Sequence, residues 1–396
     1  MSSRLSYVWL ATRCGVSAGM AVSLLRAFGS PEAVFAADRE ALTTAKDCPL
    51  RKVQVDALCD KNTEQAERIL AQCAKDGIQV ITLGDSAYPD RLRAIENPPA
   101  VLYVRGKWPD FDVMPGIAVV GTREATPYGL KTAEHIGSVL GKNGFITVSG
   151  MALGNDGAAH RGALRAGGLT VAVLAGGVDV CYPPQHRSLM GDILLSGAII
   201  SEYPPGTEPR GEHYHARNRI ISGLSVATVI VEAPGYRSGA LITARAALDQ
   251  GRDVYAVPGA LDAPQSAACN ELIEKGEAAL LRSPEALVRT YSGLLPTPHG
   301  EYHAPRPVRA PKKPQAVRPA PQKIEKTIAS SSGVLPDSLS GDERRIAELV
   351  QQGVGTPEDL IERCGLPAPR VMSLITMLEM DGILRREKGR LVLGCQ

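Results

Sequence analysis

The sequence is poor in aromatic residues and has almost no excess charge of either sign. Phe, Trp and Tyr make up 4% of its 396 residues, and the formal net charge at pH 7 is +2. The chain as a whole therefore has no strong electrostatic attraction for nucleic acid, although a local basic surface is still allowed. The eight cysteines are scattered and form no C-x-x-C pair. This argues against a zinc site or a disulfide framework and favours a reducing compartment, so we expect a cytoplasmic protein.

Long hydrophobic runs and the common nucleotide and catalytic motifs are also missing. Since no run of about 18 apolar residues occurs, we expect no membrane span. The N-terminal residues lack the apolar stretch of a signal peptide. The sequence contains no G-x-x-x-x-G-K-[ST] loop, no full G-x-G-x-x-G fingerprint, no G-x-S-x-G elbow and no metal-ligand cluster. We therefore expect no cofactor, no metal and no catalytic residue, and interpret the chain as a binding protein rather than an enzyme.

What is present divides the chain into four segments. Residues 1–75 have helical patterns, and residues 76–294 alternate short apolar runs with helical stretches. This alternation predicts a doubly wound, mostly parallel, extended Rossmann-like α/β sheet. Residues 295–340 are rich in Pro, Lys and Arg and are interpreted as a linker. Residues 341–396 predict three helices and a hairpin, which make a winged helix-turn-helix.

The first segment has a well-marked helix boundary. Gly29 is a helix stop, Ser30 an N-cap and Pro31 the first residue of the next helix. Short helices joined in this way are typical of SAM-like or helix-hairpin-helix-like domains. Two roles stay open for the segment: a module that grips DNA backbone, or a packing domain without a ligand.

Within the second segment, each expected element can be placed by residue range. Strands are expected at 77–83, 101–105, 116–120, 145–148, 170–174, 198–201, 227–231 and 253–257, and helices at 127–142, 155–167, 186–195, 240–250 and 270–276. Ligands of such sheets bind beyond the carboxyl ends of the strands. The loops expected there are 121–123, 149–157, 175–179, 233–239 and 258–259.

The expected recognition helix of the winged domain has little positive charge. It spans 369–379, where Arg370 is its only cation. Because reading the major groove usually requires more donors, we expect this domain to contact protein, or DNA only weakly.

A glycine-rich turn at 149–157 is the first candidate site. It joins an expected strand to an expected helix, where backbone N–H groups converge on an anion. Ser149 and Asn155 offer side-chain hydrogen bonds, while Gly150 and Gly154 allow close approach of the backbone. Arg123, just after another strand, suits bidentate contact with a phosphate or pairing with an acid.

The helix after this turn has an acid and an imidazole on one face. Asp156 and His160 are four residues apart. Since no nucleophile accompanies them, we interpret the pair as a structural hydrogen bond that shapes the loop. Arg161 and Arg165 are spaced in the same way and extend a basic strip.

Two later segments complete the candidate site. Arg217, Asn218 and Arg219 open a short amphipathic segment, which either contacts phosphate or forms a buried network that pins loops. Glu232 ends a strand and either holds a loop or faces a sugar hydroxyl. Ser238-Gly239 then begins a helix, whose free N–H groups would accept an anion.

In this order, these segments resemble the DprA/Smf family of DNA-processing proteins. The resemblance covers the whole α/β segment, and the flanking helical and winged domains also look like those that many members carry. The matching motifs are Gly121-Thr122-Arg123, 149–154, Ala159-His160, Gly177-Val178-Asp179, Tyr182-Pro183, 201–206, 217–225, Val231-Glu232-Ala233 and 256–259.

The resemblance implies a protein that binds single-stranded DNA, protects incoming strands during natural transformation and helps to load a RecA-type recombinase. It also implies a homodimer formed through the Rossmann-like domain. Carried onto this sequence, the DNA-binding residues are Arg123, Ser149, Gly150, Gly154, Asn155, Arg165, Arg217, Asn218, Arg219, Ser238 and Gly239. Asp156, His160 and Glu232 are expected to be structural.

The chain departs from the family pattern at three positions. Asn155 stands where members usually have Ile, Ala240 where they usually have Ser, and Ala268 where many have Gly. These changes affect the fine shape of the pocket. Because aromatics are sparse, we expect base stacking to contribute little, so binding should be salt-dependent and largely independent of sequence.

Two other functions are alternatives for this sequence. One is a nucleotide-cleaving enzyme of the lysine-decarboxylase-like Rossmann class. Those enzymes carry Pro-Gly-Gly-x-Gly-Thr, whereas residues 233–239 read Ala-Pro-Gly-Tyr-Arg-Ser-Gly; release of base from AMP would favour the enzyme. The other is a transcriptional regulator acting through the winged helix, which a preference for duplex DNA would support.

Overall fold

The structure is a computed structural model that forms two compact units, Met1–Val308 and Arg309–Gln396. It describes residues 2–45, 48–235, 238–295, 339 and 341–366. Nearer the C-terminus it describes residues 371–372, 374–375, 378, 383–387 and 390–393.

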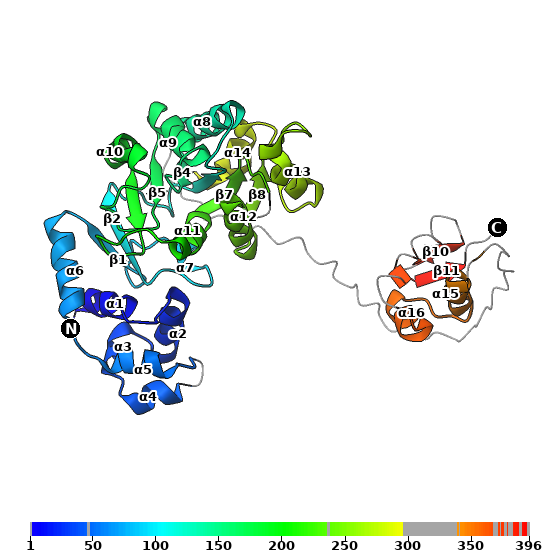
Figure 1. Cartoon of the computed structure of the whole chain (residues 1–396), viewed down its shortest axis with the longest axis horizontal. Helices are drawn as coiled ribbons and strands as arrows, with labels where there is room; N and C mark the ends of the chain where they lie inside the picture. The colour runs from blue at the N-terminus through cyan, green and yellow to red at the C-terminus, as the bar shows by residue number, and fades with distance from the viewer. Residues whose placement is uncertain are drawn as a thin grey trace. The chain divides into compact units, whose positions relative to one another are not determined.

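The first unit is built on a nine-stranded sheet with the order β1-β2-β6-β5-β4-β3-β7-β8-β9 (Figure 1). From β3 to β9 all pairings are parallel, while β2 pairs antiparallel with both β1 and β6. The strands are β1 Gln79–Thr82, β2 Val101–Gly106, β3 Gly116–Val120, β4 Ile146–Ser149, β5 Thr170–Val173, β6 Ala198–Ser201, β7 Ser225–Ile230, β8 Asp253–Ala256 and β9 Ala279–Leu280. The predicted doubly wound, mostly parallel Rossmann-like sheet is confirmed. The two-residue strand β9 was not predicted.

The strand order reverses at β3. Strands β4, β5 and β6 follow on one side of it, whereas β7, β8 and β9 follow on the other. The connections that leave β3 and β7 therefore diverge at the carboxyl ends of two neighbouring strands. Such a switch point opens a crevice in doubly wound folds.

Helices connect the strands. They are α7 Asp90–Arg93, α8 Pro127–Lys142, α9 Asn155–Arg165, α10 Arg187–Ser196, α11 Gly211–Gly223, α12 Gly239–Asp249, α13 Ala267–Glu274 and α14 Pro284–Tyr291, with short 3-10 turns at Pro184–His186, Pro264–Ser266 and Ser292–Leu294. The sequence predicted α8, α9, α10, α12 and α13 but not α7, α11 or α14. The short amphipathic segment expected after Arg217 is in fact part of the 13-residue helix α11.

Six helices precede the sheet, and their core continues into it. They are α1 Ser3–Ala11, α2 Ala18–Phe28, α3 Pro31–Ala36, α4 Arg39–Thr44, α5 Lys52–Cys59 and α6 Glu64–Lys75. Gly29 ends α2 with φ +84°, and the Ser30 side chain accepts from the Ala33 N–H, as predicted. Buried Trp9 and Tyr103 belong to one apolar cluster. The helical segment and the sheet therefore form one compact unit, whereas the sequence suggested separate segments.

The second unit has helices α15 Gly341–Gln351 and α16 Pro357–Cys364, followed by the antiparallel hairpin of β10 Leu384–Glu387 and β11 Arg390–Leu393. The Thr356 hydroxyl accepts from the Asp359 N–H and caps α16. Ile346, Leu360 and Leu384 are fully buried in its core or nearly so. The predicted linker 295–340 lies almost entirely outside the described residues, as do most of the predicted recognition helix 369–379 and its Arg370.

No helix in the described part of the chain has both the length and the apolar character that crossing a bilayer requires.

Candidate functional site

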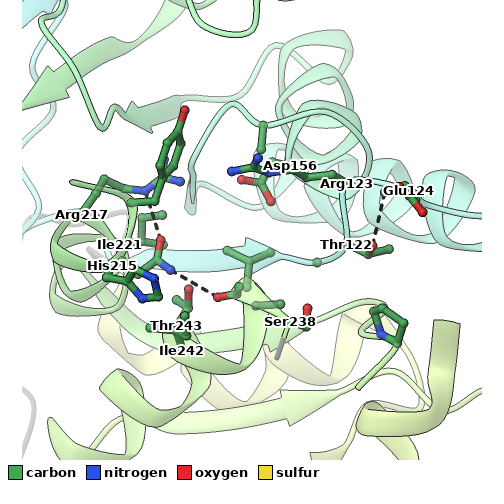
Figure 2. Close-up of a pocket in the computed structure, with 18 of the residues that line it drawn as sticks. Thr122, Arg123, Glu124, Asp156, His215, Arg217, Ile221, Ser238, Ile242 and Thr243 are labelled. Carbon is green, nitrogen blue, oxygen red and sulfur yellow. Dashed lines mark hydrogen bonds between the residues drawn. The ribbon is translucent and has the colours of Figure 1, made fainter. Parts of the chain in front are cut away.

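A cleft of about 630 Å³ opens at the switch point, beyond the carboxyl ends of β3 and β7 (Figure 2). Its walls come from four places: the loop after β3, the start of α9, the middle of α11 and the start of α12. We call Asp156 and Arg217 the floor of the site, and Arg123, Tyr214 and His215 its rim.

Arg217 on the floor is buried, with 5% of its surface exposed. Its Nη1 donates to the carbonyl oxygens of Gly150, at 2.8 Å, and of Val173. Its Nε donates to Asn218 Oδ1 at 3.1 Å. A Cβ on Gly150 would overlap the Arg217 guanidinium, so this position needs glycine for the approach of Arg217.

Asp156 is the acid beside this arginine. Its Oδ2 accepts from the Gly150 N–H at 3.0 Å. Burial raises the pKa of Asp156, while the charge of Arg217 and backbone hydrogen bonds oppose that rise. Burial likewise lowers the pKa of Arg217, and Asp156 opposes that change. Each residue therefore offsets part of the cost of burying the other.

The predicted turn supports the cleft from behind. Ser149 is fully buried and donates through Oγ to the Val119 carbonyl at 2.6 Å. Gly154 has φ +76°, and a Cβ there would overlap the Thr122 carbonyl. Ser149 and Gly154 do not line the cleft, and neither does Gly150, which lies beneath Arg217. The DNA-binding role of these residues stays a prediction, and the structure gives each of them a scaffolding contact.

Asn155 is also fully buried. Its N–H donates to the Thr122 carbonyl at 3.3 Å. In the amide orientation that satisfies both ends, Nδ2 donates to the Gly129 carbonyl at 3.1 Å and Oδ1 accepts from the Thr122 N–H at 3.3 Å. The side chain therefore joins α9 to the loop after β3. Its DNA-binding role is likewise still a prediction.

The predicted hydrogen bond between Asp156 and His160 is wrong. His160 Nδ1 lies 2.7 Å from Thr170 Oγ1, on the sheet, whereas Asp156 accepts from the loop. One turn of helix gives the two side chains a common face, but the loop N–H groups at the start of α9 draw the acid away. Burial lowers the pKa of His160 to about 3, which keeps the ring neutral.

Two predicted arginines point away from the cleft. Arg165 forms an exposed ion pair with Glu134 in the last turn of α9, about 14 Å along the helix from Asp156. Arg219 binds Glu202 through two contacts of 2.8 and 2.6 Å, and its Nε donates to the Asn97 carbonyl. Neither lines the cleft.

Glu232 holds the loop that carries Arg123. It is 1% exposed and accepts from both the N–H and the hydroxyl of Thr126, the N-cap of α8. This contact fits the first of the two roles expected for Glu232, which is to hold a loop, rather than the second, which is to face a sugar hydroxyl.

The rim carries the groups that a ligand can reach. Arg123 is exposed, and its guanidinium carbon lies 4.9 Å from the centre of the Tyr214 ring. The Tyr182 ring is 6.2 Å from that of Tyr214. His215 lines the same cleft and is exposed. The sequence did not lead us to assign Tyr214, Tyr182 or His215 to the site, although Tyr182 belongs to a matching motif and Tyr214 stands one helical turn before Arg217.

The start of α12 completes the opposite wall. Ser238 and Gly239 line the cleft, and no side-chain hydrogen bond caps this helix at Ser238. Asn218 Nδ2 donates to the Gly239 carbonyl at 3.2 Å and ties α11 to α12. An exposed arginine that faces an uncapped helix N-terminus suits an anion such as phosphate.

Among the described residues, no group of three or more His, Cys, Asp or Glu side chains is placed to hold a metal ion.

The chain is similar in sequence to proteins of one family. The family model for DNA recombination-mediator protein A matches residues 79–292, and the DprA winged helix domain matches residues 331–390. Protein Smf of Synechocystis is 42% identical over 212 residues, which are 53% of this chain and 53% of that protein. The match therefore spans about half of the Synechocystis protein.

Two further relatives are similar over more of their length. The DNA processing protein DprA of Bacillus subtilis is 39% identical over 213 residues, 54% of this chain and 71% of that protein. The X-ray structure of DNA processing protein A from Streptococcus pneumoniae has 31% identity and a TM-score of 0.64, and the alignment covers 73% of this chain and 98% of that one.

Proposed function

The chain belongs to the DprA/Smf family, and we propose that it binds single-stranded DNA in the cleft at the β3–β7 switch point. The observation that carries this proposal is the exposed guanidinium of Arg123, held over Tyr214 and facing the start of α12. Arginine and free helix N–H groups bind phosphate whatever the base, so a strand would be held by its backbone.

The ring of Tyr214 gives the strand a second kind of contact. Bases of a single strand have free faces, and an aromatic side chain beside a phosphate site can stack on them. The scarcity of aromatics in the sequence led us to expect little stacking. Because Tyr182 lies near Tyr214, the region around the cleft has more aromatic side chains than the overall composition suggests.

We infer that the protein binds DNA without turning it over. The charged groups of the floor hydrogen-bond to the scaffold, since Arg217 donates to backbone carbonyls and Asp156 accepts a backbone N–H. Family membership supports the finer roles that we propose: protection of incoming DNA, loading of a RecA-type recombinase, action as a homodimer through the Rossmann-like domain, and a cytoplasmic location.

The test is a gel shift with a single-stranded oligonucleotide at low salt. Arg123→Ala should weaken binding several-fold and reduce the salt slope by about one counterion. The matched control is Arg289→Ala, which removes an exposed arginine from α14, outside the cleft lining. Equal affinity of the Arg123→Ala variant and the wild type would refute the assignment of the cleft.

A second titration separates this proposal from a duplex-binding function. The wild type should bind a single strand more tightly than a duplex of the same length, because splayed phosphates and bases can enter the cleft. A preference for the duplex would instead favour a regulator that acts through the winged helix.

A further inference from the structure

His215 is an exposed imidazole on the cleft side of α11. In Figure 2, His215 and Arg217 stand on one side of the cleft, with Arg123 and Glu124 across from them. Within the described part of the chain, His215 makes no hydrogen bond and no ion pair. Both ring nitrogens are therefore available to a ligand.

The other charged groups that line the cleft balance one another. Among the described lining residues, the positive groups are Arg123 and Arg217, and the negative groups are Glu124 and Asp156. With a neutral imidazole the lining carries no excess charge of either sign. Protonation of His215 would therefore give the lining an excess positive charge.

Among the described residues, the elements packed on α11 contribute no charged side chain to the lining of the cleft. Helix α12 carries Arg245 and Asp249, neither of which lines the cleft, and β5 and β7 contain no ionisable residue. Helix α7 contacts the far end of α11, where Leu92 approaches Gly223.

On α11 itself, an acidic residue lies about one turn before His215 and a basic residue lies about one turn after it. Glu212 lies on the side of the N-terminus, is largely exposed and is 4.0 Å from His213 Nε2. Arg219 follows His215 by four residues, but Glu202 already pairs with it. Because Glu202 offsets the charge of Arg219, Arg219 adds no net positive charge beside His215.

We propose that His215 is a proton-dependent phosphate contact, which makes the affinity for DNA rise as the pH falls. This inference rests on the proposed function of the cleft. Histidine side chains change charge within the range of about pH 5 to 8, and an imidazolium donates from both nitrogens to phosphate oxygens. Because the bound phosphate favours the charged ring, binding takes up a proton.

The experiment measures the dissociation constant of the full chain for a fluorescent oligo-dT at pH 5.5, 6.5 and 7.5, at constant ionic strength. The wild type should bind about three- to five-fold more tightly at pH 5.5 than at pH 7.5, as expected for one exposed ion pair. In His215→Gln the ratio of the two constants should fall to about one. His215→Lys should bind tightly at pH 7.5 and likewise show a flat profile.

His213→Gln is the matched control, because it removes the other imidazole of α11, two residues away. His213 stacks on Tyr203 at 4.0 Å, and its Nδ1 lies 3.0 Å from the Ala175 carbonyl, so it does not line the cleft. This variant should keep the wild-type pH ratio. Thermal unfolding at each pH checks that every variant is folded.

The outcomes separate the two proposals. If the wild type shows no pH dependence, or if His215→Gln keeps it, the role of His215 is refuted while the Arg123→Ala result still decides the function of the cleft. If Arg123→Ala binds as well as the wild type at all three pH values, the cleft itself is refuted. Calorimetry in two buffers with different ionisation enthalpies should show proton uptake by the wild type and not by His215→Gln.

Discussion

Arg217 on the floor of the cleft and Arg123 on its rim are arginines of one site, placed in contrasting environments. Arg217 is 5% exposed and donates to the carbonyls of Gly150 and Val173. Arg123 is exposed and rests on the face of Tyr214. The first shapes the cleft by holding loops together, whereas the second keeps its donors for a ligand. A motif rich in arginine therefore contains both scaffold and contact residues, and burial distinguishes them.

The largest effect that tests this contrast is on stability. Arg217→Met keeps the length of the side chain but leaves Asp156 buried without its cation and two carbonyls without a donor. We expect a loss of about 3–5 kcal/mol in the free energy of unfolding. Arg123→Ala, on the rim, should cost less than about 0.5 kcal/mol. Urea denaturation of both variants measures the difference, and similar losses would erase the distinction between floor and rim.

A second effect concerns the buried imidazole of His160. Burial lowers the pKa of His160 to about 3, against about 6.5 in an unfolded chain. Below pH 6.5 the unfolded chain binds a proton that the folded chain does not, so this residue contributes less stability as the pH falls. The stability advantage of the wild type over His160→Gln should shrink by about 3 kcal/mol between pH 6.5 and pH 4. Urea denaturation at several pH values checks this, and parallel profiles would contradict it.

The smallest effect is expected at Arg165, which the sequence placed in the DNA site. Its exposed pair with Glu134 is at the end of α9 away from the cleft. Arg165→Ala should change DNA affinity less than two-fold, since only a distant charge is lost, while Arg123→Ala weakens it several-fold. The gel shift described above compares the two variants. An equal loss of DNA affinity in the two variants would show that the binding surface extends along α9, beyond the rim.

The sequence predicted the architecture better than the roles of the residues. Apolar runs and glycine stops carry local information, so most strands and the boundary at Gly29 were predicted to within about two residues. Helix α11 was missed because its buried side includes Arg217 and Asn218. A helix buried through hydrogen bonds rather than apolar contacts shows little amphipathic pattern.

The rest of the site depends on contacts far apart in the chain. In the sequence Arg219 looks equivalent to Arg217, but in the structure it forms an ion pair with Glu202. Glu232 reaches Thr126, which is 106 residues away. No local pattern indicates such partners. Tyr214 could have been found had the helix been recognised, because it stands one turn before Arg217 and shares its face. His215 stands one turn before Asn218 and could have been found in the same way.

The apolar cluster that joins Trp9 of α1 to Tyr103 of β2 makes the N-terminal helices inseparable from the sheet. A truncation at residue 76 would uncover part of that cluster, including Val80 and Val101, and exposed apolar surface of this kind promotes aggregation. Residues 1 to 295 should therefore melt in a single cooperative transition, and the minimal expressible fragment that contains the cleft must begin with α1. In evolutionary terms, the helical segment cannot be exchanged like an independent module unless its sheet-facing side chains change with it.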